Sequence, residues 1–295
     1  MITVVIYTKD DADCIESCLR SLTGQESSCE HELVVLDDCS SDVTPALVRE
    51  RFPQVRVASA GKPAGWVGAL RASCDTFKGD NVAFLGAHCT ALPGWLDAVQ
   101  EVMGEGLRVA VGMGYHGPGK LLNRFEALTM HGPYLSCEPG RVDGIWDDNF
   151  AISKSLLAQA LPDTDTILSD GAGAYLMSRK LAGMGIEIHY RPSMKVDHTT
   201  HNLGQIARSW YGEMAENAVA MRKADPTLPG AGLLRFGPVA GALLSGGRLV
   251  QTVANMHRFR RALSIPIYEV WVHSFILACL MPAYFAGLVR QMINR

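Results

Sequence analysis

The stretch that decides the fold is Val82-Ala-Phe-Leu-Gly-Ala-His-Cys-Thr-Ala-Leu-Pro-Gly-Trp-Leu96. It opens with the short apolar run Val82–Leu85, which is typical of a strand buried on both faces. The turn pair Pro93-Gly94 then precedes a helical apolar pattern. Because ligands of open α/β sheets bind at the carboxyl ends of strands, we expect the chemistry of this protein at Gly86–Cys89.

The segments before this stretch alternate between apolar runs and helical patterns. Strands are expected at Ile2–Tyr7, Leu33–Leu36 and Val55–Ala58, with helices through about Thr23 and about Phe52 between them. This alternation predicts an α/β fold with a doubly wound, mostly parallel sheet, flanked by helices and connected by right-handed crossovers.

The pattern continues after Leu96, with few signals over residues 115–148. The further elements that we expect are helices over Trp95–Gly104, Ser155–Leu161, 170–182 and 203–223, and extended segments over Arg108–Gly114, 147–154 and Ile186–Val196.

The composition indicates a globular protein. The 295 residues are 48% hydrophobic and 19% charged, so disorder is not expected. The net charge of -3 gives no basic field for nucleic acid, and we expect no nucleic-acid partner.

The cysteines and the start of the chain bear on the compartment. The eight cysteines include no Cys-x-x-Cys pair, and we interpret them as free thiols in a reducing compartment. The sequence begins directly with a strand and carries no signal-peptide pattern. We therefore expect a cytoplasmic protein.

An acidic motif follows the second expected strand. It reads Asp37-Asp-Cys-Ser-Ser-Asp-Val-Thr44. A carboxylate at the end of a strand can accept hydrogen bonds from a nucleobase N–H or from ribose hydroxyls. Alternatively, Asp37, Ser40 and Asp42 cap the next helix.

These two stretches resemble the family-2 glycosyltransferases, which have the GT-A fold. The resemblance covers about residues 1–220 and rests on Asp-Asp-x-Ser-x-Asp-x-Thr and on the frame around Pro93-Gly94-Trp95-Leu96. Those enzymes usually carry an Asp-x-Asp motif that binds the metal, and here Gly86 and His88 stand at its two Asp positions.

The resemblance implies a site for the nucleotide. Asp38, Ala87 and the loop after the first strand, with Thr8, would contact the nucleotide sugar. The segment Gly68-Ala-Leu-Arg71 looks like the corresponding helix of members that glycosylate polyprenyl phosphates. Arg71 would neutralise diphosphate charge, or it is a surface arginine on a helix.

The resemblance also implies a catalytic base. The family places an acidic residue at the start of a helix in its second half, and Ser169-Asp170 lies at about that point. Asp170 would remove the proton from the acceptor hydroxyl. Alternatively, Asp170 is only the helix N-cap.

Histidines would provide the metal ligands in place of the missing carboxylates. His88 and His198 are the candidates, with His201 three residues on. Imidazole suits Mn²⁺ and later transition ions better than Mg²⁺, so a divalent cofactor, Mn²⁺, is expected. Asp147 and Asp148 could contact the acceptor or metal, but we favour a solvated loop for them.

The carboxyl-terminal part differs in composition. Between Arg235 and Arg261 all five charged residues are arginines, and Val270–Val289 is an almost unbroken apolar run. That length can span a bilayer, lie in the interface, or form a buried helix of an oligomer. We expect a glycosyltransferase domain over residues 1–222 and a membrane-associating helical region over residues 223–295.

Together these features predict an inverting glycosyltransferase. It would move a sugar from a nucleotide-diphosphate sugar to a hydroxyl of a membrane-linked lipid or polysaccharide precursor, at the cytoplasmic face of the membrane. The resemblance suggests a bacterial enzyme of cell-envelope glycan synthesis. A homo-oligomer is one of the states that we consider for it. The alternative is a catalytically inactive GT-A domain that binds nucleotide or acts as a scaffolding subunit.

Overall fold

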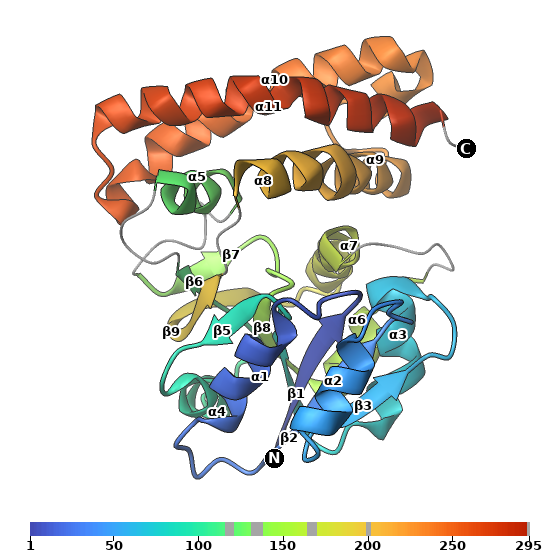
Figure 1. The fold of residues 1–295 in the computed structure, drawn as a ribbon, viewed down its shortest axis with the longest axis vertical. Helices are drawn as coiled ribbons and strands as arrows, with labels where there is room; N and C mark the ends of the chain where they lie inside the picture. Colours follow the sequence, from blue (N-terminus) through green and yellow to red (C-terminus); the bar gives the residue numbers. More distant parts are fainter. Residues whose placement is uncertain (116–120, 131–137, 164–169, 199–201, 294–295) are drawn as a thin grey trace. The chain divides into compact units, whose positions relative to one another are not determined.

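The structure of the protein is a computed structural model. It describes residues 1–115, 121–130, 138–163, 170–198 and 202–293. These residues form two compact units (Figure 1). The first contains Met1–Tyr115 and Ser136–Thr199, and the second contains His116–Leu135 and Thr200–Arg295. Residues 202–222 thus belong to the second unit, and the functional boundary at residue 222 stays a prediction.

The first unit is built on a nine-stranded sheet, with the order β3-β2-β1-β4-β8-β6-β9-β5 and with β7 beside β9. The strands are β1 (Ile2–Thr8), β2 (His31–Asp37), β3 (Arg56–Ser59), β4 (Asn81–Leu85), β5 (Cys89–Ala91), β6 (Val109–Tyr115), β7 (Gly140–Val142), β8 (Asn149–Ser153) and β9 (Ile188–His198). The run from β3 to β4 is parallel, whereas β8 is antiparallel to both of its neighbours. The predicted α/β sheet is confirmed.

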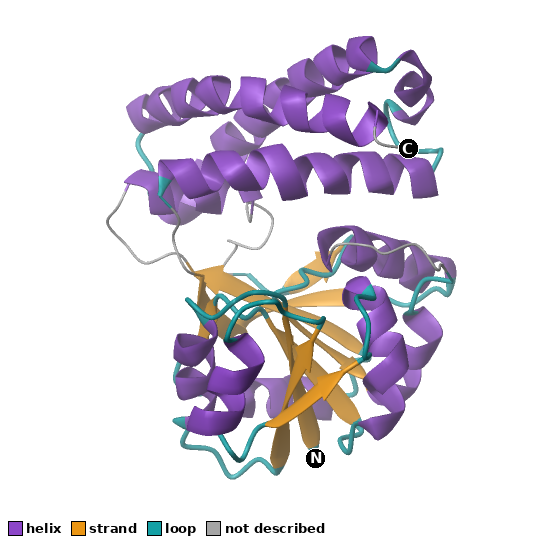
Figure 2. Ribbon diagram, turned by 45° about the vertical axis from the view of Figure 1, so that its right-hand side comes forward, coloured by secondary structure: helices purple, strands orange, loops and turns teal. Residues whose placement is uncertain are grey.

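Helices cover both faces of this sheet (Figure 2). They are α1 (Ile15–Thr23), α2 (Thr44–Arg51), α3 (Gly65–Ser73), α4 (Trp95–Gly104), α6 (Lys154–Ala160) and α7 (Asp170–Gly183). In α1 the apolar positions expected from the helical spacing, Ile15, Cys18, Leu19 and Leu22, are all buried.

The centre of the core lies where β4 meets β8. Phe84 and Phe150 face each other across this pair, with ring centroids 4.2 Å apart and ring planes within 6°. The indole of Trp66 in α3 packs on both rings. Burial of three aromatic side chains fixes the two strands to each other, and with them the polar residues just beyond their ends.

One strand of the sheet was not expected from the sequence. The short strand β5, which follows β4 after only three residues, was missed; it pairs antiparallel with β9, so that Cys89 lies opposite His198. The extended segment expected over Ile186–Val196 is confirmed as β9, which runs through Pro192. The pairing of β9 with β6 shifts register between Gly112 and Met113, and this irregularity accommodates the proline, which has no amide to donate.

The second unit is helical. Its helices are α5 (Leu121–Met130), α8 (Leu203–Ser209), α9 (Ala215–Ala224), α10 (Pro238–Phe259) and α11 (Ile267–Ile293), with a π-helical turn over Trp210–Met214. The single helix expected over 203–223 is thus interrupted. The buried core of this unit includes Phe125, Trp210, Leu277 and Tyr284.

The helix α11 is longer than the apolar run that predicted it. It is the one helix, within the described ranges, that is long and apolar enough to cross a membrane. Its buried residues recur at three- and four-residue spacing, among them Val270, Leu277 and Tyr284. The opposite side exposes large apolar side chains, including Trp271 and Phe275. One face therefore packs inside the unit and the other is apolar and open.

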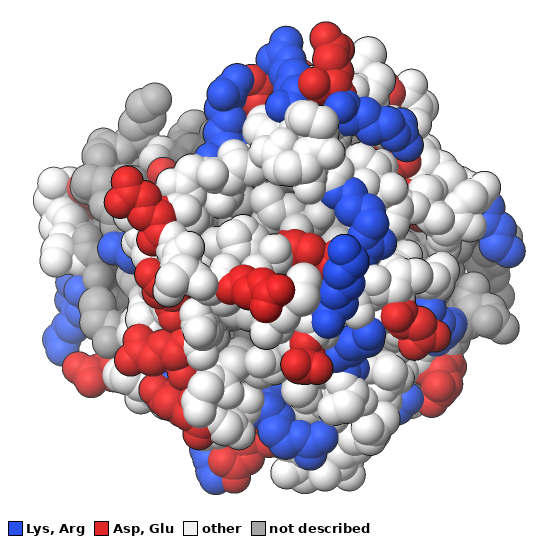
Figure 3. All heavy atoms as spheres, turned by 90° about the horizontal axis from the view of Figure 1, so that it is seen from below, with Lys and Arg blue, Asp and Glu red and all other residues white. Residues whose placement is uncertain are grey.

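Acidic and basic side chains are interspersed on the face seen in Figure 3. For example, Glu16 forms ion pairs with Arg20 in the same helix, α1, and with Arg51 in α2. Such exposed pairs contribute little to stability, typically about 0–1 kcal/mol. The mixture of both signs agrees with the small net charge of -3.

Candidate active site

Four side chains with metal-binding atoms gather beyond the end of β4. They are His88, Cys89, Asp148 and His198, and one ligand atom from each lies within 4.8 Å of the others. Three elements bring them together: the turn from β4 into β5, the segment before β8, and the last residue of β9. The cluster therefore lies at the carboxyl end of β4, where the sequence predicted the chemistry.

Asp148 is the centre of the cluster. Its Oδ2 lies 3.3 Å from Nε2 of His88 and 3.8 Å from Nε2 of His198. The two imidazoles meet edge to face, with ring centroids 4.6 Å apart. His198 is buried, and the indole of Trp146 lies 6.3 Å from its ring. The two histidines that were predicted as metal ligands are thus brought together.

The favoured interpretation of Asp148 as part of a solvated loop is wrong. Its side chain is only 14% exposed, because it lies between the two histidines instead of pointing into solvent. Asp148 therefore adds a carboxylate to a cluster for which only histidines were expected as ligands. Sequence reasoning noticed Asp147 and Asp148 but had no signal that ranked one of them as a site residue.

The charges in the cluster act on one another. Burial alone lowers the pKa of His88, but the neighbouring Asp148 carboxylate outweighs it and raises this pKa to about 10. Burial raises the pKa of the Cys89 thiol well above its usual range. Metal ligands must be deprotonated, so an ion bound here would have to displace the proton from His88, and from Cys89 as well if it took the thiolate.

The residues present fit a divalent ion. Two imidazole nitrogens and one carboxylate oxygen converge on one point, and imidazole is accepted by Mn²⁺ and later transition ions. The carboxylate of Asp148 lies between His88 and His198 and is largely shielded from water.

Asp170 is the first residue of α7, next to the N-cap position that the alternative interpretation gave it. Its Oδ1 accepts a hydrogen bond from the amide of Gly171 at 3.0 Å. Burial and the charge of Asp148 raise its pKa, while His88 opposes the rise. The carboxylate thus interacts electrostatically with the metal-binding cluster. Its role as the base stays a prediction.

Asp38 is buried and joins two loops. Its Oδ1 accepts the amide of Ala64 at 2.7 Å, and its Oδ2 accepts the amide of Gly65 and the hydroxyl of Tyr7. Lys9 lies 3.5 Å away. These bonds connect the end of β1 and the segment after β3 through Asp38, at the same edge of the sheet. The contact of Asp38 with the nucleoside stays a prediction.

The other predicted nucleotide-binding residues lie around this edge or beside it. Thr8 ends β1 and is buried, and its hydroxyl donates to Asp11 at 2.8 Å. Ala87 is buried between Gly86 and His88. Arg71 is exposed on α3, and its guanidinium donates to the carbonyl of Pro162. Their roles stay predictions, and His201 lies outside the described residues.

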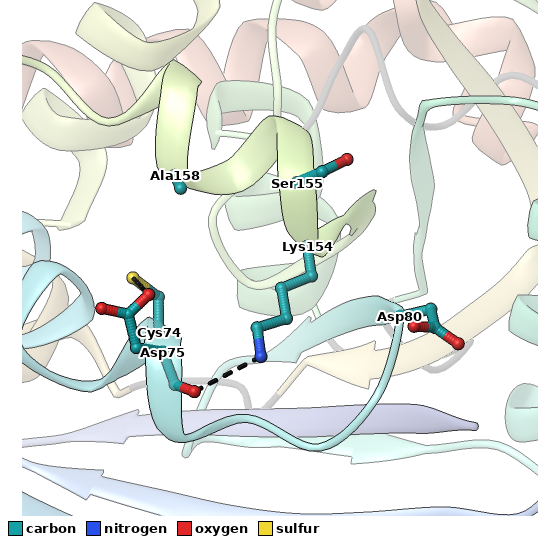
Figure 4. Close-up of a pocket in the computed structure, with 6 residues that line it drawn as sticks. All are labelled: Cys74, Asp75, Asp80, Lys154, Ser155 and Ala158. Carbon is teal, nitrogen blue, oxygen red and sulfur yellow. Dashed lines mark hydrogen bonds between the residues drawn. The ribbon is translucent and has the colours of Figure 1, made fainter.

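A separate pocket of about 390 Å³ lies at the other end of β4 (Figure 4). It is lined by Cys74, Asp75, Asp80, Lys154, Ser155 and Ala158. The ammonium of Lys154 donates to the carbonyls of Asp75 and Phe77, which closes one side. Asp80 precedes the first residue of β4, so this pocket is not part of the histidine cluster.

Comparison with known proteins decides the family. The sequence profile described as glycosyl transferase family 2 matches residues 3–178, which is more than half of the chain. The chain belongs to glycosyl transferase family 2. The recognition of this family from the two sequence motifs is confirmed.

One curated relative and several solved structures are similar to this family-2 enzyme. The succinoglycan biosynthesis protein ExoO of Rhizobium meliloti (strain 1021) is 33% identical over 112 residues, 37% of this chain and 32% of that protein. The match therefore spans about a third of the relative.

The solved structures support the GT-A fold. The mannosyltransferase PcManGT from Pyrobaculum calidifontis, in complex with GDP-Man and Mn²⁺, has a TM-score of 0.59 at 16% identity, covering 100% of this chain and 87% of that chain. Glucosyl-3-phosphoglycerate synthase from Mycobacterium tuberculosis, with Mn²⁺ and UDP, has a TM-score of 0.50 at 20% identity, covering 75% and 77%. At these identities the likeness shows the fold.

Proposed function

We propose that this glycosyltransferase inverts the anomeric centre and uses a divalent ion, Mn²⁺, to bind a nucleotide-diphosphate sugar. The observation that carries the proposal is the convergence of His88, Asp148 and His198 at the carboxyl end of β4. The electrostatic link of Asp170 to this cluster supports it. Solved structures of the same fold that contain Mn²⁺ and a nucleotide or nucleotide sugar also support it.

In this proposal, separate residues bind the nucleotide, take the proton and hold the metal ion. The loops after β1 and β3, tied together through Asp38, form one wall of the nucleotide site. Asp170 takes the proton of the acceptor hydroxyl as that oxygen attacks the anomeric carbon. A base on the face opposite the departing diphosphate gives inversion in a single displacement. His88, Asp148 and His198 would hold the metal ion, which supplies positive charge for the leaving diphosphate.

The rival function, an inactive GT-A scaffold, was suggested by the missing Asp-x-Asp motif. Asp148 weakens that argument, because it places a carboxylate in the cluster without needing one at residue 86. A screen of nucleotide sugars by thermal shift tests the donor directly. One donor should raise the melting temperature more in Mn²⁺ than in chelator, and a chain that responds to none would speak for a scaffold.

The acceptor side of the proposal concerns the membrane. The exposed face of α11 carries Trp271 and Phe275, which are 68% and 70% exposed. The opposite face of α11 packs in the second unit. An apolar face with tryptophan, near the arginine-rich segment 235–261, suits a helix that lies in the interface of an anionic membrane better than one that crosses it alone. The acceptor would then be membrane-linked.

We predict that the full chain binds vesicles containing anionic phospholipid and that Trp271→Glu/Phe275→Glu removes this binding. Two charges on the apolar face oppose insertion, and the fold should tolerate them because both side chains are exposed. Vesicle sedimentation measures the bound fraction. Val43→Glu, at an apolar residue 64% exposed in the first unit, is the matched control and should bind as the unmodified chain does.

A chain that stays in the supernatant, or a double variant that binds equally, would contradict the membrane proposal. Light scattering on the same samples tests whether the exposed face of α11 is an interface between two copies of the chain. If Trp271→Glu/Phe275→Glu instead converts a dimer into a monomer, the exposed face of α11 joins two copies of the chain.

A further inference from the structure

Gly86 and Asp148 face each other across the β4–β8 pair. The antiparallel register runs from Asn81 opposite Ser153 to Leu85 opposite Asn149. One step further brings Gly86 opposite Asp148, and the amide of Gly86 donates to the carbonyl oxygen of Asp148 at 3.0 Å. Side chains at facing positions lie on the same side of the sheet, with Cβ atoms about 4.5–5.5 Å apart.

The carboxylate of Asp148 fills the space that a side chain at residue 86 would take. A Cβ added to Gly86 would lie 2.8 Å from Cγ of Asp148, closer than real Cβ contacts come, and would meet Oδ1 more closely still. The φ of Gly86 is outside the left-handed region, so backbone conformation does not require glycine there. The lack of space requires glycine at residue 86, because the carboxylate of Asp148 lies where a side chain of that residue would be.

We propose that Asp148 supplies, from the turn before β8, the metal-binding carboxylate that the resemblance places at residue 86, and that Gly86 makes room for this side chain. This inference rests on the proposed metal-dependent function. It deepens that function by giving a reason why residue 86 is glycine in a site whose carboxylate comes from Asp148. Asp148 and His88 then act together as the Asp-x-Asp pair would, with Asp148 contributed by a segment about sixty residues later in the chain.

The proposal makes the two positions interchangeable but mutually exclusive. A carboxylate at both would crowd one space and place two like charges together, and a carboxylate at neither would leave only imidazoles. The four combinations are the unmodified chain, Gly86→Asp, Asp148→Gly and the exchange Gly86→Asp/Asp148→Gly. They form a cycle that measures the coupling between the two positions.

Mn²⁺ binding by the purified full chain is the test, measured without nucleotide by electron paramagnetic resonance of the free ion. We expect Asp148→Gly to weaken binding by about 10-fold or more. Gly86→Asp should weaken it as well and lower the melting temperature. The exchange should bind within about 3-fold of the unmodified chain, which is a strongly non-additive result. Asp147→Asn, the same change of charge one residue away, is the matched control and should bind normally.

Unchanged Mn²⁺ affinity in Asp148→Gly would overturn the proposal, as would an exchange variant that is folded by circular dichroism but binds as weakly as Asp148→Gly. If the exchange variant does not fold, the comparison of Asp148→Gly with Asp147→Asn decides alone. Because no sugar donor is present, these results are independent of turnover. Normal ion binding with no turnover of any nucleotide sugar would contradict the proposed function and leave the exchange of carboxylates standing.

Discussion

Asp170→Asn should lower turnover by about 100-fold or more and leave donor binding nearly unchanged. The amide keeps the size of the side chain and can still accept the hydrogen bond from the Gly171 amide, so α7 should begin as before. What is lost is the group that takes the acceptor proton. Initial rates at saturating donor, with donor affinity from calorimetry, separate the two effects.

Asp163→Asn is the matched control for Asp170. This residue precedes α7, is 90% exposed and pairs with Lys180, so it is not part of the cluster. We expect its turnover to stay within about 2-fold of the unmodified chain, as is usual for surface substitutions. If Asp170→Asn retains full turnover while Asp163→Asn does not, the base has been assigned to the wrong carboxylate.

His88→Ala should abolish the response of activity to metal and lower turnover by about 100-fold, because one imidazole ligand is lost beside Asp148. His88→Asp should recover part of the activity and shift the preference from Mn²⁺ towards Mg²⁺, because carboxylate oxygen is the ligand that Mg²⁺ prefers. Rates measured across a titration of each ion, after treatment with chelator, give both quantities.

His189→Ala is the control on the same strand. His189 lies in β9 beside Glu187 and is not one of the four residues of the cluster. Its removal should leave the metal response unchanged. Full activity in excess chelator, equal in the unmodified chain and in His88→Ala, would mean that a protein cation holds the leaving group, with Arg71 the first to test.

The parallel half of the fold could be predicted because its strands are short and apolar on both sides. Ile2–Thr8 and Asn81–Leu85 contain the expected runs, and the helices between them show clear spacing. The strand β5 has three residues and no distinctive pattern, and it forms because β9 offers it a partner. Helix α10 is rich in glycine and is stabilised by packing within the second unit, which local propensity does not reveal.

The candidate site could be predicted where it follows the order of the chain. His88 stands in the frame of a recognised motif and His198 comes two residues after the predicted segment Ile186–Val196, so both were named from the sequence. Asp148 was named as a possible contact but assigned to a solvated loop, because its place in the cluster depends on the register of β8 against β4, which no pattern within residues 138–148 reports. The burial of Asp38 beneath two loop amides likewise depends on the folded loop after β3.

The most direct test of the account is the release of nucleoside diphosphate from a panel of nucleotide sugars, with and without a lipid-linked acceptor. We predict Mn²⁺-dependent release from at least one donor, faster with acceptor, lost in excess chelator and about 100-fold slower in Asp170→Asn. A folded, Mn²⁺-loaded chain that binds and turns over no donor would contradict it and indicate a GT-A domain that serves as a scaffold.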